Sequence, residues 1–207
     1  MSGIDLTSLG VFVLALLVAA ASPGPNIAAI VARVLGRGTQ GALAFTAGVA
    51  IGDVVWLTLA VFGLAVLAQS FAGVFLVVRY AGAAYLLYLA WRLWTAPAAA
   101  PGVAANLARE HPARLFLGGL AVTMGNPKVM VFYLALLPNL VDLSRLDPLG
   151  YAELVAATLG VLAVVFGGYI LLAARARRLF TSARAMRLVN RGTGAVMAGA
   201  AAMVAAR

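Results

Sequence analysis

The first long apolar segment of the chain is interrupted by residues that break helices. From Leu6 to Ala32 the sequence runs for 27 residues without a charged side chain, and a helix that crosses a bilayer needs about 20 such residues. Inside that run stands 22-SPGPN-26, where each proline removes a backbone donor and the glycine adds conformational freedom. Because unpaired backbone groups are costly in hydrocarbon, such a break is tolerated only against protein or water. The segment predicts a discontinuous transmembrane helix, and a kink that only shapes packing is the plainer alternative.

The composition places the whole chain in a lipid bilayer. Of its 207 residues, 64% are hydrophobic and 10% are charged, whereas soluble domains average about 25% charged residues. The net charge of +9 is explained by loop charge that orients the spans, so no nucleic-acid partner is expected. The chain has no cysteine and one histidine, His111, which excludes thiol chemistry and a histidine metal cluster. We expect an all-α integral membrane protein without cofactor or metal.

Six apolar segments are expected to be transmembrane helices, and together they form one transmembrane domain over residues 1–207. They lie at about Leu6–Val34, Gly41–Gln69, Phe71–Trp94, Leu115–Leu137, Tyr151–Ala174 and Leu188–Ala206. Only the fifteen residues 192–206 of the last segment are free of charge, which is short for a bilayer core. Five spans with a peripheral C-terminal tail are therefore the alternative.

The stretch 95-TAPAAAPGVAANLAREHP-112 divides the six spans into two halves. Residues 1–95 and 112–207 each hold three spans, with a cytoplasmic linker at 96–111, so the second half enters the membrane from the opposite side. If the halves are repeats, they are inverted repeats. Both halves place Asn beside Pro in mid-span, in SPGPN and in 125-GNPK-128. We expect two inverted three-helix repeats with broken helices in spans one and four that meet at the midplane.

The distribution of charge orients these spans. With the N-terminus outside, the loops after spans one, three and five hold 11 of the 15 basic residues. The outer side then takes four of the six acids, namely Asp5, Asp142, Asp147 and Glu153. Because basic residues collect on the cytoplasmic side of membrane proteins, an outside N-terminus is expected.

Two ionisable residues lie deep in the predicted spans. Asp53 stands in the middle of span two, where an acid costs about 2.5–3.5 kcal/mol, and Lys128 lies too deep in span four to reach either surface. Such residues usually mark proton or substrate pathways, and a structural ion pair between them is the alternative. Gly48 and Gly52 precede Asp53 as a GxxxG pair, which predicts close helix packing. Tyr133 is interpreted as part of an interfacial belt, together with Tyr80, Trp91, Trp94 and Tyr151.

Four motifs follow one another through the first two thirds of the chain: SPGPN, 48-GVAIGD-53, 84-AYLLYLAWRLW-94 and 125-GNPKVMVFYLALLP-138. In this order they resemble the lysine exporter family of amino-acid translocators (LysE/RhtB), whereas the chain after Pro138 matches only in general hydropathy. The resemblance implies a small exporter of amino acids or related metabolites in the bacterial inner membrane. It also implies proton antiport and a homo-oligomer such as a dimer.

The resemblance places the substrate at the residues Pro23, Gly24, Pro25, Asn26, Asn126, Pro127 and Lys128. The half-helix N-termini near Asn26 and Asn126, with Lys128, are expected to hold the substrate carboxylate. Asp53 is expected to couple protons by binding a proton in alternation with substrate or Lys128. An enzyme is not expected, because the chain lacks a deep Ser/His pair, paired aspartates or a metal cluster. A passive channel, or an exporter of another small solute or a cation, remains the alternative.

Overall fold

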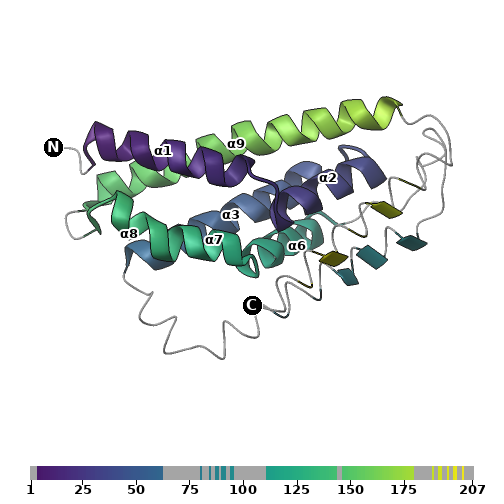
Figure 1. The fold of residues 1–207 in the computed structure, drawn as a ribbon, viewed down its shortest axis with the longest axis horizontal. Helices are drawn as coiled ribbons and strands as arrows, with labels where there is room; N and C mark the ends of the chain where they lie inside the picture. The colour runs from purple at the N-terminus through teal and green to yellow at the C-terminus, as the bar shows by residue number, and fades with distance from the viewer. Residues whose placement is uncertain are drawn as a thin grey trace.

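The computed structural model describes residues 4–62, 111–143 and 146–179, with separate positions between 80 and 95 and between 188 and 202. Over these residues the chain is helical and contains no strand. The helices are α1 (Leu6–Ala21), α2 (Pro25–Arg37), α3 (Ala42–Val61), α6 (Pro112–Met124), α7 (Pro127–Val131), the π-helix η2 (Phe132–Leu136), α8 (Leu137–Leu140) and α9 (Pro148–Leu179). Figure 1 shows them running side by side along one long axis.

Two helices and two bent helix pairs are long and apolar enough to cross a membrane. The single helices are α3 and α9, α1 is bent by 52° relative to α2, and α6 is bent by 58° relative to Pro127–Leu140. The described residues therefore hold two spans, or up to four if each bent pair is one span. The two expected helix breaks are present. Expected spans three and six and the linker 96–111 fall almost wholly outside the described residues, so six spans and an inverted repeat stay predictions.

The first break follows from the residues that flank it. α1 ends where Ser22 leaves the helix with a ψ of 128°, and Gly24 is extended, with φ −169° and ψ −174°. Pro25 occupies the first position of α2, where its missing N–H costs nothing because N–H groups of a first turn have no partner within the helix. Proline also disfavours helical backbone at the residue before it, so the break is fixed by local chemistry.

The second broken helix contains a wider turn after its bend. In η2 the Leu137 N–H donates to the Phe132 carbonyl, five residues back. Pro138 follows at once, and a proline has no N–H and clashes with the carbonyl four residues before it. The wider π turn accommodates that missing bond, and such turns occur frequently at functional sites.

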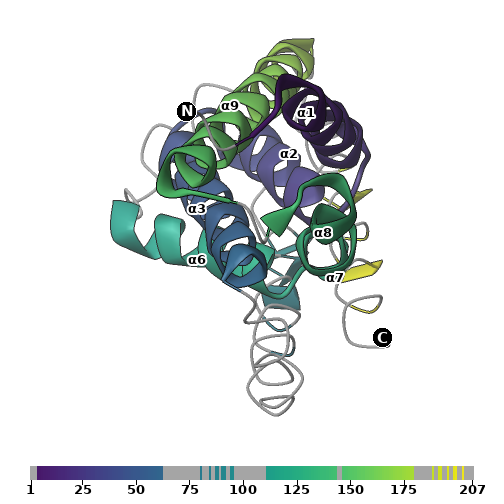
Figure 2. The same ribbon diagram turned by 90° about the vertical axis from the view of Figure 1, so that its left-hand side faces the viewer.

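Glycines bring α3 and α6 together at backbone distance. A Cβ atom on Gly48 would overlap the Phe116 carbonyl oxygen, and a Cβ atom on Gly119 would overlap the Phe45 carbonyl oxygen. Each helix therefore uses one glycine to admit the other's backbone. Viewed along the bundle, α3 lies between α6 and α9, and it packs against both (Figure 2).

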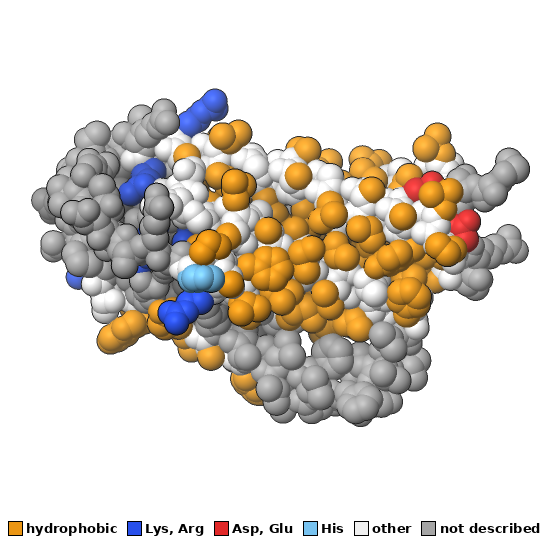
Figure 3. Space-filling view, turned by 180° about the vertical axis from the view of Figure 1, so that it is seen from behind, with side chains coloured by type: hydrophobic (Ala, Val, Ile, Leu, Met, Phe, Trp, Pro, Cys, Tyr) orange, Lys and Arg blue, Asp and Glu red, His pale blue; other side chains and the backbone are white. Residues whose placement is uncertain are grey.

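Apart from Asp53 and Lys128 in the middle of the bundle, the charged side chains named here gather at its two ends, as Figure 3 shows for one face. The basic end contains Arg33, Arg37, Arg114, Arg175 and Arg177, at the end of α2, the start of α6 and the end of α9. The acidic end contains Asp5, Asp142, Asp147 and Glu153, around the start of α1 and the start of α9. Hydrophobic side chains cover the surface between these ends in Figure 3, as expected for a multi-pass membrane protein.

Candidate functional site

The two helix breaks meet around one pocket in the middle of the bundle. Its empty volume is about 400 Å³, which includes space open to the outside. The polar lining consists of Ser22, Gly24, Asn26, Asp53, Asn126, Lys128 and Tyr133. The apolar lining includes Leu16, Ile27, Val129, Phe132, Leu162 and Phe166. The pocket is therefore an apolar chamber with a few convergent polar groups.

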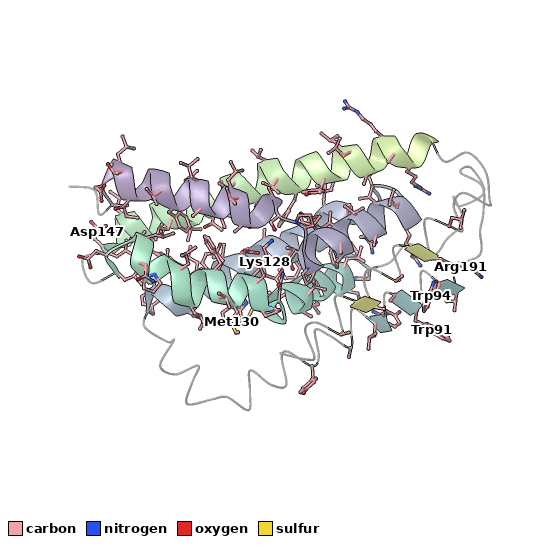
Figure 4. All side chains as sticks on the ribbon, in the orientation of Figure 1. Trp91, Trp94, Lys128, Met130, Asp147 and Arg191 are labelled. Carbon is pink, nitrogen blue, oxygen red and sulfur yellow. The ribbon has the colours of Figure 1, made fainter. Side chains whose placement is uncertain are left out.

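Lys128 enters this pocket from the first turn of α7, midway along the bundle (Figure 4). Its Nζ donates to the Ser22 carbonyl oxygen over 2.6 Å. A Cβ atom on Gly24 would lie 3.6 Å from that Nζ, so the ammonium rests against the extended backbone of the first break. An ion pair with Asp53 is not formed in this structure, because the ammonium is bonded to Ser22 instead.

The carbonyl groups at the end of α1 are held by side chains from two other helices. Lys128 bonds Ser22, and the Tyr169 hydroxyl of α9 donates to the Ala21 carbonyl over 2.8 Å. The C-terminal end of a helix carries partial negative charge, which suits a lysine ammonium. Sequence reasoning missed Tyr169, since nothing in its own segment indicates which carbonyl it reaches.

A pair of asparagines joins the two breaks. Asn126 Nδ2 donates to Asn26 Oδ1 over 2.9 Å, and the two side chains are 2% and 7% exposed. Asn126 also caps its own helix, because its Oδ1 accepts from the Lys128 backbone N–H over 3.1 Å. Two residues a hundred positions apart thus fix the breaks against each other.

The two half-helix N-termini differ in what they offer a ligand. The first turn of α7 is capped by Asn126, and that helix has only five residues before η2. The first turn of α2 has no side-chain cap, and its Asn26 and Ile27 line the pocket. Of the two expected anion sites, the start of α2 is therefore the one with uncapped N–H groups beside the pocket.

The three predicted site prolines do not line the pocket. Pro23 is exposed, whereas Pro25 and Pro127 are the first residues of α2 and α7. Their contribution is to end one helix segment and start the next. The remaining predicted site residues, Gly24, Asn26, Asp53, Asn126 and Lys128, all reach the pocket.

Asp53 reaches the pocket from α3 and is 4% exposed. The adjacent Gly52 packs against Thr123, where an added Cβ would lie 2.6 Å from the Thr123 Cβ. The Thr123 carbonyl accepts a hydrogen bond from Trp56 Nε1 over 3.3 Å. These contacts between α3 and α6 hold the helix turn that presents Asp53.

Tyr133 lies beside Asp53 and is not an interfacial residue. It is 0% exposed, packs edge-on against Phe132 and lines the pocket. The belt interpretation is therefore wrong for this residue. Its place in mid-span, five residues after Lys128, was the available signal, because a tyrosine at that depth lies far from either interface.

Comparison with known proteins identifies one matching family and several similar proteins. Residues 17–207 match the family described as LysE type translocator. A leucine efflux protein of Salmonella choleraesuis (strain SC-B67) is 30% identical over 150 residues, covering 72% of this chain and 71% of that protein. A leucine efflux protein of Klebsiella pneumoniae is 29% identical over 185 residues, covering 88% and 87%. A homoserine/homoserine lactone efflux protein of Salmonella typhimurium is 30% identical over 175 residues, covering 84% of each chain. No solved structure matches the chain.

Proposed function

The chain belongs to the LysE type translocator family, and on that basis we propose that it is a secondary active exporter of amino acids driven by proton antiport. Membership makes it a membrane transporter rather than an enzyme. Amino acids or their close derivatives are proposed as substrates because the similar proteins are named for the efflux of leucine and of homoserine. Proton coupling is proposed because Asp53 is a buried acid in the central pocket.

The observation that carries this proposal is that Lys128 and Asp53 share one pocket without pairing. Both line it, and Lys128 is bonded to a backbone carbonyl rather than to the carboxyl group. A zwitterionic amino acid offers a carboxylate to the ammonium and an amino group to the carboxyl group. The uncapped start of α2 adds N–H groups on the carboxylate side.

The apolar lining supports a neutral substrate. Leu16, Phe132, Leu162 and Phe166 surround the pocket, and Asp53 is the acid among the residues that line it. A cationic side chain would need further acidic groups, whereas an aliphatic side chain would be buried against these four residues. Leucine is therefore the first substrate to test.

The charge distribution supports an inner-membrane protein with its N-terminus outside. The acidic end contains Asp5, and the basic end contains the arginines of α2 and α9, so the positive-inside rule places the acidic end outside. Two inverted repeats are proposed because the two breaks face each other through Asn26 and Asn126. Self-association stays a prediction.

The test is transport of radiolabelled leucine in proteoliposomes with an imposed pH gradient. Wild-type protein should move leucine against its concentration gradient, and a protonophore should abolish that movement, which would separate an antiporter from a passive channel. Asp53→Asn keeps the shape of the side chain but cannot ionise, so it should lose uphill transport. Leucine exchange without a gradient should persist with weaker leucine binding, because the amide still accepts a hydrogen bond from the amino group. Uphill transport by Asp53→Asn at the wild-type rate would remove Asp53 from proton coupling.

The ion-pair alternative predicts a different pattern. If Asp53 served only to neutralise Lys128, each single variant would fail and the double variant Asp53→Asn, Lys128→Met would recover, because no unpaired buried charge would remain. We expect the double variant to be inactive in uphill transport, since it lacks both the proton acceptor and the ammonium.

A further inference from the structure

Asp53 belongs to a group of three buried polar side chains that come from three different elements. They are Asp53 of α3, Tyr133 of η2 and Thr158 of α9, and they are 4%, 0% and 0% exposed. The Tyr133 hydroxyl faces both the Asp53 carboxyl and the Thr158 hydroxyl. Neither contact has the geometry of a hydrogen bond, and within the described residues Asp53 Oδ2, Tyr133 Oη and Thr158 Oγ1 have no other partner.

A group of buried polar atoms without hydrogen-bond partners favours the binding of a small polar ligand among them. A buried polar atom without a partner costs about 1–3 kcal/mol, and native proteins rarely leave several of them together. Water is the ligand whose chemistry fits, because one molecule can donate to a carboxylate and a hydroxyl and accept from another hydroxyl. Buried waters typically make about three such bonds.

A second polar pair continues from this group toward the acidic end of the bundle. The hydroxyl groups of Thr58 and Tyr151 lie 2.7 Å apart. Thr58 follows Asp53 along α3 and Tyr151 precedes Thr158 along α9, and these two helices pack against each other. At 1.5 Å per residue, the second pair is displaced along the bundle by about 7–10 Å from the first group.

Between the two polar groups lies an apolar layer. Leu57 and Leu154, both 0% exposed, belong to the same core cluster and stand on α3 and α9 between the two levels. In this conformation the apolar layer separates the two polar groups. Protons can therefore pass from one group to the other only if α3 and α9 separate locally. A proton path that opened only in one conformation would suit an antiporter, which has to prevent free leakage.

From this arrangement we infer that Tyr133 and Thr158 bind water through which Asp53 exchanges its proton with the acidic end of the bundle. The inference rests on the proposed proton antiport and adds the route by which the proton arrives. The water bound by Tyr133 and Thr158 gives a proton to the Asp53 carboxylate and takes one in turn from water that reaches the acidic end. The bound water ends as it began, and one proton has moved from the acidic end to the carboxylate.

The proton route and the substrate use different neighbours of Asp53. Within the described residues, the titratable groups that face Asp53 are Tyr133 and Lys128. Lys128 is engaged with the first helix break, where the substrate carboxylate is proposed to bind. Tyr133 is therefore the neighbour proposed to hold the proton-carrying water.

Two conservative variants test the route, and α3 supplies a matched control. Tyr133→Phe and Thr158→Val keep the side-chain shape and remove one hydroxyl each. Thr46→Val removes another buried hydroxyl without a hydrogen-bond partner among the described residues, seven positions before Asp53 on the same helix and toward the basic end. The assay is again leucine transport in proteoliposomes, measured once with a pH gradient and once as exchange without a gradient.

Tyr133→Phe and Thr158→Val should slow gradient-driven transport about tenfold or more, because each removes a hydroxyl that positions the proton-donating water. Thr158 does not line the pocket, so Thr158→Val should leave exchange at the wild-type rate, and Thr46→Val should resemble the wild type in both assays. Loss of exchange in Thr158→Val, or an equal loss of driven transport in Thr46→Val, would overturn the route. Wild-type driven transport by both variants, with Asp53→Asn inactive, would overturn the route and leave the antiport intact. Absence of proton-driven transport in the wild type would remove the antiport and the route together.

Discussion

Replacing Gly48 by alanine should destabilise the protein because it forces α3 and α6 apart. A Cβ atom there would overlap the Phe116 carbonyl oxygen and lie 2.7 Å from the Phe116 carbonyl carbon and 3.0 Å from the Leu120 nitrogen. All three atoms belong to the backbone of α6, so no side chain can rotate away to make room.

The expected loss of stability in Gly48→Ala is the difference between two effects. Alanine is favoured over glycine within a helix by about 1 kcal/mol, and overpacking costs about 1–3 kcal/mol. Because the obstacle is backbone, the upper value applies, and Gly48→Ala should lower the free energy of unfolding by about 2 kcal/mol. Gly160→Ala is the control, since an added Cβ there meets no described atom within 4 Å, and it should raise stability by up to about 1 kcal/mol.

The assay is unfolding in mixed detergent micelles, followed by circular dichroism. Gly119→Ala faces the same obstacle from the other helix, because its Cβ would overlap the Phe45 carbonyl oxygen, and it should cost a similar amount. Once the helices have separated for one methyl group, the second needs little more room. The double variant should therefore lose at least about 1 kcal/mol less than the sum of the single losses. Additive losses, or a Gly48→Ala protein as stable as Gly160→Ala, would refute this account of the helix contact.

Two further predictions concern the first broken helix. Pro23→Ala combined with Pro25→Ala should allow helical backbone across the 52° bend. The variant should insert into the membrane and be as stable as the wild type, while leucine transport falls sharply. Transport at the wild-type rate would show that the prolines only bend the helix. Hydrogen bonds from Ser8 lower the pKa of Asp5 at the start of α1. They come from the Ser8 side chain and from the Ser8 backbone N–H, whose nitrogen lies 2.9 Å from Asp5 Oδ1. A lowered pKa means that the charged carboxylate stabilises the fold at neutral pH and that this contribution is lost below about pH 4, so Asp5→Asn should flatten the acid side of a plot of unfolding midpoint against pH.

The parts of the fold that the sequence predicts are those set by local chemistry. Pro25 and Pro127 can each begin a helix but cannot continue one, so both breaks could be placed within a residue or two. Asp53 and Lys128 could be chosen as site residues because ionisable groups at that depth need a protein or aqueous environment. The pocket brings these two residues and both breaks together.

The parts that the sequence does not predict depend on how the helices meet. Which carbonyl Lys128 reaches is decided by the position of α7 against the end of α1, and no pattern within either segment encodes that position. The glycine pair of α3 predicts a close neighbour, but the matching Gly119 becomes evident only when α6 is in place. The preference of aromatic residues for interfaces predicts an interfacial Tyr133, whereas the packing of the helices buries it in the core.

The hydrogen bond between Asn26 and Asn126 has a consequence for how easily the two breaks separate. It is a single bond between neutral amides, 2.9 Å long, and such bonds contribute about 0.5–1.5 kcal/mol net. Its loss would change the population of a separated arrangement by only about two- to tenfold. The asparagine bond therefore contributes only a small part of the free energy that holds the two breaks together. The Lys128 ammonium also joins them through the Ser22 carbonyl, and a hydrogen bond with a charged donor is the stronger kind.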